Sequence, residues 1–181
     1  MIKALMVMAI AGLLATQAKA VVLGGEILRQ NGNGTFVKLV PDNIFAVGED
    51  NFDTDHLYAF DEDQNIELER AIRVDIGGEA GIIPGGTVVF FDSLSGIHYG
   101  FVYFDAPILG IAAYQDTMGA TDFLANTSVV YISTELRGLE EGDKVWIDDK
   151  DPQKLWVYWA GSSPGDYIRV FTERSPNAPM M

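Results

Sequence analysis

The stretch "IELERAIRVDI", residues Ile66–Ile76, decides the fold class that we predict from this sequence. Its even-numbered positions are apolar except for Arg70, and its odd-numbered positions are polar or charged except for Ala71. A period of two is typical of a strand with one buried and one solvated face, as in antiparallel sheets. We therefore expect a strand from Ile66 to Ile76, with a bend or bulge near Arg70.

The rest of the chain has the same character. Short runs rich in β-branched and aromatic residues alternate with Gly, Pro, Asp and Asn, and these runs are typical of strands. The further predicted strands are Thr35–Val40, His56–Phe60, Thr87–Phe91, Tyr99–Phe104, Ile108–Ala112, Ser128–Ile132, Lys144–Ile147, Lys154–Trp159 and Tyr167–Thr172. The one helix that we expect, Thr117–Ala125, is short and is weakened by Gly119. The pattern predicts an all-β, single-domain antiparallel β-sandwich of jelly-roll type with one short connector helix.

The first twenty residues have the features of a secretory signal peptide. Lys3 precedes an apolar run from Ala4 to Ala15, and the segment ends in the small-residue motif Ala18-Lys19-Ala20. The apolar run is shorter than the roughly 20 residues that a membrane span needs. We expect residues 1–20 to be a bacterial signal peptide, residues 21–176 to form the sandwich domain and residues 177–181 to be a disordered tail. The mature chain would then be secreted and would contain no membrane span.

The negative charge of the chain limits the classes of molecule that it is expected to bind. The 181 residues include 26 Asp and Glu but only 12 Lys and Arg, for a formal charge of −14. Such a field repels nucleic-acid phosphates and anionic lipids, so we expect no nucleic-acid partner. The sequence contains no cysteine, so burial and hydrogen bonding must stabilise the exported fold without disulfides.

An acidic run, "FDEDQNI", resembles the start of a calcium-binding EF-hand loop. Asp61, Asp63 and Asn65 have the right alternation, but Ile66 stands where the loop needs Gly and Ile72 where it needs Glu. The EF-hand is therefore excluded, and a solvated turn between two strands is the simpler interpretation.

Calcium remains a hypothesis at other acidic residues. Asp50, Asp53 and Asp55 form the better candidate site, followed by the acids of "IDDKDP", residues 147–152. Calcium prefers several oxygen ligands, and weak calcium sites are useful outside the cell. The alternative is a set of hydrated turns, because clusters of acids arise by composition alone in so acidic a chain.

The strand "KLWVYWA" carries the candidate ligand-binding residues. Leu155, Val157 and Trp159 should point to one face of the strand, and Trp156 and Tyr158 to the other. If that second face is open, Trp156 and Tyr158, together with Trp146, would form a surface on which a sugar ring stacks. The alternative is that these rings pack beneath a loop or the predicted helix.

Several segments taken together resemble a known family. They are "LYAFDEDQNI", "VVFFDS", "GFVYFDAPILGI", "TDFLANTSVVYIS", "LRGLEEGD" and "SSPGDYIRVFTE". As a set they resemble uncharacterised exported bacterial proteins, many of which carry a PEP-CTERM sorting tail, over roughly Asp53 to Glu173. No such motif follows Glu173 here, so we expect no membrane-sorting step. The resemblance implies export and a role at the cell surface or in an exopolysaccharide matrix, without catalytic residues to transfer.

Three functions stay open at this point. The favoured one is a non-enzymatic extracellular binding or matrix module whose partner is an extracellular polysaccharide. The second is a glycan hydrolase, which would need a cleft with two carboxyl groups, one of raised pKa. The third is a purely structural surface protein, which burial of all three tryptophans would favour.

Overall fold

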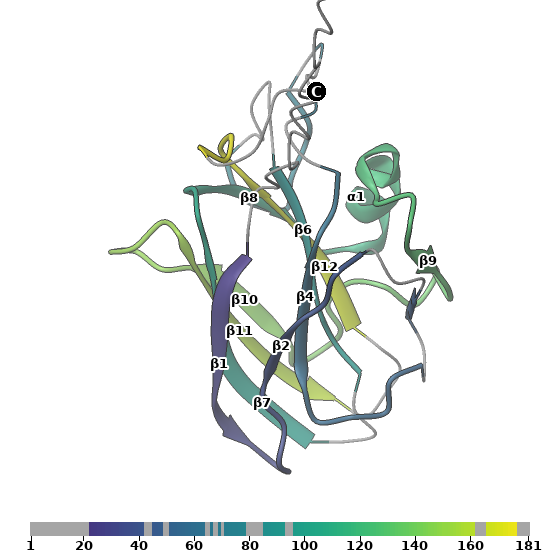
Figure 1. Cartoon of the computed structure of the whole chain (residues 1–181), viewed down its shortest axis with the longest axis vertical. Coiled ribbons are helices and arrows are strands. Elements are labelled where there is room, and N and C mark those ends of the chain that lie inside the picture. Colours follow the sequence, from purple (N-terminus) through teal and green to yellow (C-terminus); the bar gives the residue numbers. More distant parts are fainter. Residues whose placement is uncertain are drawn as a thin grey trace, which may run out of the picture.

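The computed structural model describes residues 22–41, 45–48, 51–63, 66, 69, 71–78, 85–92, 96–161 and 166–176. They form two facing β-sheets, which confirms the all-β sandwich (Figure 1). The predicted signal peptide and tail lie outside the described residues. Among the described residues, no helix has the length and apolarity needed to cross a bilayer.

The first sheet has four antiparallel strands in the order β1-β7-β11-β10. They are β1 (Val22–Gln30), β7 (Gly96–Phe104), β11 (Lys154–Gly161) and β10 (Lys144–Ile147). Along β7 and β11 buried residues alternate with partly exposed ones, as expected for a sheet with one face on the core and one in water.

The second sheet has six strands in the order β2-β4-β6-β12-β8-β5. They are β2 (Phe36–Lys38), β4 (Leu57–Asp61), β6 (Gly85–Phe91), β12 (Asp166–Thr172), β8 (Ile108–Ala112) and β5 (Ile76–Gly77). Its pairings are antiparallel except for the parallel pair β2 and β4. The chain crosses between the sheets from β6 to β7, from β7 to β8 and from β11 to β12. A separate parallel pair joins β3 (Ala46–Val47) to β9 (Val130–Tyr131).

The six-stranded sheet is buried on both of its faces. Its inner face packs against the four-stranded sheet in a cluster that includes Val89, Ile168 and Trp159. Its outer face carries a second apolar cluster that includes Phe60, Phe90 and residues of the covering segments. In Figure 1, α1 and β9 lie on one side of the six-stranded sheet and the four-stranded sheet lies on the other. Every residue of β4 and β12 is accordingly buried, including the charged Arg169.

Two short helices form part of this cover. They are α1 (Gln115–Ala120), which begins two residues before the predicted helical segment Thr117–Ala125, and the 3-10 helix η1 (Asp122–Leu124), which lies inside it. Asp75 accepts hydrogen bonds from the backbone N–H of Ala113 (2.7 Å) and Tyr114 (3.1 Å) and from the Thr117 hydroxyl (2.7 Å). The Asp75 carboxylate thus fixes the start of α1, where a negative charge also complements the helix dipole.

The predicted strand Ile66–Ile76 is wrong as a continuous element. Of its described residues, only Ile72, in an isolated bridge, and Ile76, in β5, have strand pairing. The alternation nevertheless predicts the facing of the side chains. Ile66, Ile72 and Val74 pack against the outer cluster, whereas Arg73 is exposed. The segment lies on the sheet as a cover, and Asp75 uses its hydrogen bonds to hold α1.

Strand β1 has no counterpart among the strands predicted from sequence. Its pairing with β7 shifts register between Val22 and Gly24 and again between Ile27 and Arg29. Each irregularity inserts one residue, Leu23 or Leu28, into the strand, and both of these leucines are exposed. The insertions remove the period of two by which the strand would have been recognised.

A buried ion pair links the six-stranded sheet to its cover. Arg169 of β12 and Glu62 both have fully buried side chains, joined by hydrogen bonds of 2.6 and 2.9 Å. Arg169 also donates to the Thr121 hydroxyl (2.7 Å) and the Met118 carbonyl (3.1 Å), and Tyr131 donates to Glu62 (2.9 Å). Burial alone would lower the pKa of Arg169, but the Glu62 carboxylate holds that pKa above its ordinary value. The pair therefore ties α1 and β9 to the centre of the sheet.

We predict that Arg169→Met will lower the free energy of unfolding by about 3–5 kcal/mol, because it leaves the Glu62 carboxylate buried without its cation. Urea unfolding followed by circular dichroism measures the change. The control is Asp116→Asn, which removes an exposed carboxylate on α1 that does not contact Arg169 and should cost about 1 kcal/mol or less. Equal losses in the two variants would contradict the prediction.

Candidate functional site

The outer face of the four-stranded sheet carries a group of six aromatic side chains. We call it the aromatic face, and its members are Tyr99, Phe101, Tyr103, Trp146, Trp156 and Tyr158. Strand register brings them together. Trp156 of β11 pairs with Phe101 of β7 on one side and with Trp146 of β10 on the other, and Tyr158 pairs with Tyr99. Paired residues project to the same face of a sheet, so the rings come from three adjacent strands.

Three of these rings are nearly parallel. The Tyr99 and Trp156 ring centroids are 5.3 Å apart, and Trp146 lies 6.1 Å from Trp156 and 6.2 Å from Tyr99, with interplanar angles of 10–15°. Phe101 meets Trp156 edge to face, with centroids 5.5 Å apart. Trp146, on the edge strand, is 38% exposed. The rings thus pack against one another, and part of their surface remains exposed to solvent.

Polar contacts fix the orientation of Trp156. Its indole N–H donates to a carboxylate oxygen of Asp148 at 2.7 Å, and the other oxygen accepts the backbone N–H groups of Lys150 and Asp151. The hydrogen bond from Trp156 is the main reason that the pKa of Asp148 is lowered. The Lys154 ammonium lies 3.9 Å from the centroid of Trp156 and 4.0 Å from that of Phe101. These contacts fix the indole before any ligand binds.

The structure places all three candidate ligand-binding residues, Trp146, Trp156 and Tyr158, on this one face. Trp159, on the opposite side of β11, is 0% exposed and belongs to the core. Sequence reasoning missed the contribution of β7 to the face. The alternation of Tyr99, Phe101 and Tyr103 with buried residues in "GIHYGFVYF" carries the signal that would have revealed it.

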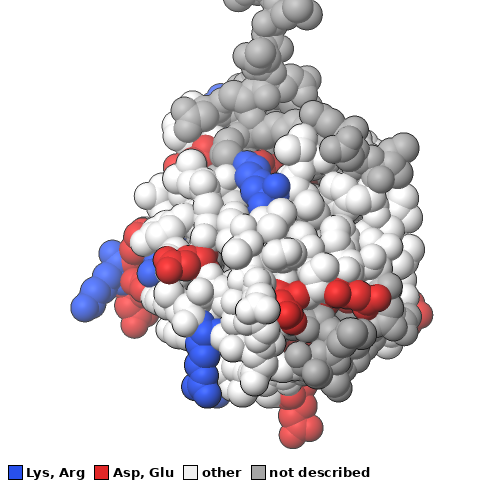
Figure 2. All heavy atoms as spheres, turned by 60° about the horizontal axis from the view of Figure 1, so that its bottom comes forward, with Lys and Arg blue, Asp and Glu red and all other residues white. Residues whose placement is uncertain are grey.

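The candidate calcium residues do not form a site among the described residues. Asp50 lies outside them. Asp53 is exposed with a positive φ of 48°, and an oxygen of Asp55 accepts the backbone N–H of Asn33 at 3.3 Å. Nowhere in the described part of the chain do three or more His, Cys, Asp or Glu side chains form a group that could hold a metal. On the face that Figure 2 shows, the acidic side chains are scattered rather than gathered in one patch.

The acidic run that begins with Asp61, the last residue of β4, is largely buried rather than a solvated turn. Asp61 accepts the backbone N–H of Val22 at 3.0 Å and pairs with Lys38 at 2.9 Å, and Glu62 pairs with Arg169. Burial raises the pKa of Asp61 despite these partners. The solvated-turn interpretation of this run is therefore wrong for Asp61 and Glu62, which have structural partners.

One carboxyl group has a strongly shifted pKa. Asp166, at the start of β12, is only 8% exposed. Burial, followed by the nearby charges of Asp143, Glu140 and Asp92, raises the pKa of Asp166 to about 8. An acid pair with one raised pKa is what a glycan hydrolase needs, but neither Asp143 nor Asp166 lines either of two cavities that the described residues form, one beside α1 and one around Glu135 and Leu136.

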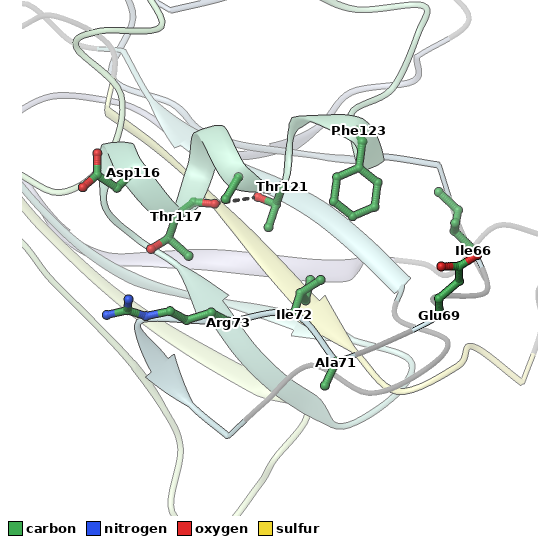
Figure 3. A pocket seen from close by; sticks show the side chains of 10 residues that line it. Ile66, Glu69, Ala71, Ile72, Arg73, Asp116, Thr117, Thr121 and Phe123 are labelled. Atoms are coloured by element: carbon green, nitrogen blue, oxygen red, sulfur yellow. Dashed lines mark hydrogen bonds between the residues drawn. The ribbon is translucent and has the colours of Figure 1, made fainter.

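The larger of these cavities lies between α1, η1 and the segment 66–73, with a volume of about 710 Å³ (Figure 3). Phe123 and Ile72 lie at its apolar side, and Asp116 and Arg73 lie toward the other end. The two hydroxyls in its wall are already engaged, that of Thr117 by Asp75 and that of Thr121 by backbone carbonyls. Besides these hydroxyls, the wall carries the charged side chains of Glu69, Arg73 and Asp116.

No protein-family model, curated protein or solved structure matches this chain.

We predict that Asp166→Asn will make the protein more stable at pH 8 than the wild type. The unfolded chain loses this proton near pH 4, whereas the folded protein keeps it until about pH 8. Wild-type stability should therefore fall across that window, by about 1.4 kcal/mol per pH unit at most for this group. The Asp166→Asn variant carries no proton that titrates in this range, so its stability should not fall for this reason.

Thermal unfolding of both proteins between pH 4 and pH 8 measures the effect. Asp116→Asn, which neutralises an exposed acid on α1, corrects for the general effect of removing one negative charge. Parallel pH profiles for wild type and Asp166→Asn would show that Asp166 is not protonated in the folded state.

Proposed function

We propose that this chain is an exported, non-enzymatic carbohydrate-binding module that binds extracellular polysaccharide on the aromatic face. The observation that carries the proposal is the group of partly exposed, near-parallel rings of Tyr99, Trp146 and Trp156 on one sheet face. The C–H groups on one side of a sugar ring pack favourably against the negative face of an aromatic ring. Rings on adjacent strands offer contacts to successive sugars of a chain.

The rigidity of the face supports a binding role. The rings project from paired strands rather than loops, and Asp148 and Lys154 fix Trp156 from two sides. A pre-organised site avoids the entropy cost of ordering side chains when a ligand binds. The signal-peptide features of residues 1–20 and the resemblance to exported bacterial proteins support a location outside the cytoplasm, where polysaccharides are present.

The two alternatives have weaker support. A purely structural role would favour burial of all the tryptophans, yet Trp146 is 38% exposed and Trp156 is partly exposed. A hydrolase would need an accessible acid pair, whereas Asp166 is 8% exposed. Two acids that contact the aromatic face are already engaged: Asp148 accepts hydrogen bonds from Trp156 and from its own turn, and Asp151 hydrogen-bonds Tyr103 and accepts the backbone N–H of Gln153.

We predict that Trp146→Ala and Trp156→Ala will each weaken glycan binding by about 10-fold, because one lost ring contact of this kind costs roughly 1 kcal/mol or slightly more. Isothermal titration calorimetry of the purified protein against a panel of neutral and acidic oligosaccharides measures the change. Trp146 is the cleaner position, since its exposure limits the effect of the substitution on folding.

Tyr114→Ala is the matched control, because Tyr114 is 54% exposed but lies beside α1, away from the aromatic face. It should bind as the wild type does. The proposal fails if no glycan in the panel binds, or if binding survives both tryptophan substitutions in variants with unchanged circular dichroism.

A further inference from the structure

The aromatic face carries both cations and acids. The strand register places Glu26, Arg29, Lys144 and Lys154 on this face together with the rings. Two further acids border it, and both are engaged: Asp148 accepts the indole N–H of Trp156, and Asp151 hydrogen-bonds Tyr103. Among the other charged side chains on the face, the cations outnumber the one acid, Glu26, which suits an anionic ligand.

Two of the cations stand at opposite ends of one row of side chains. Arg29 pairs with Tyr99, Tyr99 with Tyr158, and Tyr158 with Lys144, so the row crosses all four strands. Three steps between neighbouring strands, each about 4.8 Å, give the row a length of roughly 14 Å. Its order is cation, ring, ring, cation.

The cations at the two ends are available to a ligand. Arg29 and Lys144 are both exposed, and neither forms an ion pair with another residue in the described part of the chain. Lys154 is different, because its ammonium lies over Phe101 and Trp156 and its charge helps to lower the pKa of Asp148. Lys154 therefore stabilises the face, while Arg29 and Lys144 can pair with incoming anions.

We propose that the polysaccharide bound by the aromatic face is anionic and contains uronic acids. Its sugar rings pack against Tyr99 and Tyr158, and its carboxylates pair with Arg29 and Lys144. Arg29 has the planar, two-pronged geometry that suits a carboxylate. The negative charge of the whole protein opposes a polyanion at long range, and at physiological salt this repulsion is screened beyond roughly 8 Å. The selectivity for an anionic over a neutral polysaccharide then depends on contacts made directly with the aromatic face. This inference rests on the proposed carbohydrate-binding function and names its ligand class.

The test compares four ligands on the purified protein by affinity electrophoresis and calorimetry. They are polymannuronate oligosaccharides, a sulfated glucan, neutral cello-oligosaccharides and poly-glutamate. We expect the polymannuronate to bind more tightly than the neutral glycan. The double variant Arg29→Gln with Lys144→Gln should bind polymannuronate about 10-fold more weakly, from the loss of two exposed ion pairs, and should bind the neutral glycan unchanged. Arg73→Gln is the control, since it removes an exposed cation from the segment that covers the other sheet.

The outcomes separate this inference from the function on which it rests. Tight binding of neutral glycans that depends on Trp146 but not on Arg29 and Lys144 would overturn the uronate assignment and leave the carbohydrate-binding function standing. Tighter binding of the sulfated glucan than of polymannuronate would overturn the choice of carboxylate. Equal binding of poly-glutamate would show that the face recognises charge rather than sugar. Absence of binding to every glycan would overturn both proposals.

Discussion

The buried ion pair between Arg169 and Glu62 is the interaction on which the arrangement of the layers depends. Arg169 lies on β12 in the middle of the six-stranded sheet, and its guanidinium reaches Glu62, the Thr121 hydroxyl and the Met118 carbonyl. A charge in this position must have its partners, because an isolated buried ion costs several kcal/mol. The ion pair therefore requires the segment around α1 and η1 to lie on this face. The outer apolar cluster can form only when that cover is in place.

This constraint determines which surface remains open to a ligand. The six-stranded sheet is buried on both faces, and the four-stranded sheet is buried on its inner face alone. The remaining outer face belongs to four paired strands, three of which carry its aromatic rings. Trp156 is oriented by Asp148 and Lys154 rather than by the core. The molecule thus separates stability from recognition. The Arg169–Glu62 ion pair and apolar burial stabilise the six-stranded sheet. The aromatic rings lie on the outer face of the other sheet, away from these contacts.

The sequence predicts the fold class and part of the site, and the physical reasons for its failures differ from place to place. Alternation in β7 and β11 is a local property of a half-buried strand, so those elements and the facing of Trp156, Tyr158 and Trp159 were predictable. The stretch Ile66–Ile76 alternates equally well, because a covering segment that lies flat on a sheet also faces alternate residues inward. Alternation of apolar and polar residues shows which side chains face inward. Whether the segment also pairs as a strand depends on whether a neighbouring strand has a free edge.

Other failures arise from contacts that are distant in sequence. Glu62 and Arg169 are 107 residues apart, and no local pattern shows that they meet. The acid run that contains Asp61 and Glu62 therefore looked like a solvated turn. The ring pairs of the aromatic face follow from the strand order β7-β11-β10, which no single strand contains. The row that runs from Arg29 to Lys144 has the same origin, since it forms only through the full order β1-β7-β11-β10.

The two irregularities in β1 make pairing between strands of different molecules less favourable. Strands β1 and β10 are the borders of the four-stranded sheet, and a border strand with regular geometry can recruit a strand from another molecule. The extra residues Leu23 and Leu28 distort the hydrogen-bonding border of β1, and β10 is only four residues long. Both borders are thus poor templates for intermolecular strand addition. If copies of the protein gather along a polysaccharide, as the proposed function requires, they can then lie side by side without pairing their sheets into aggregates.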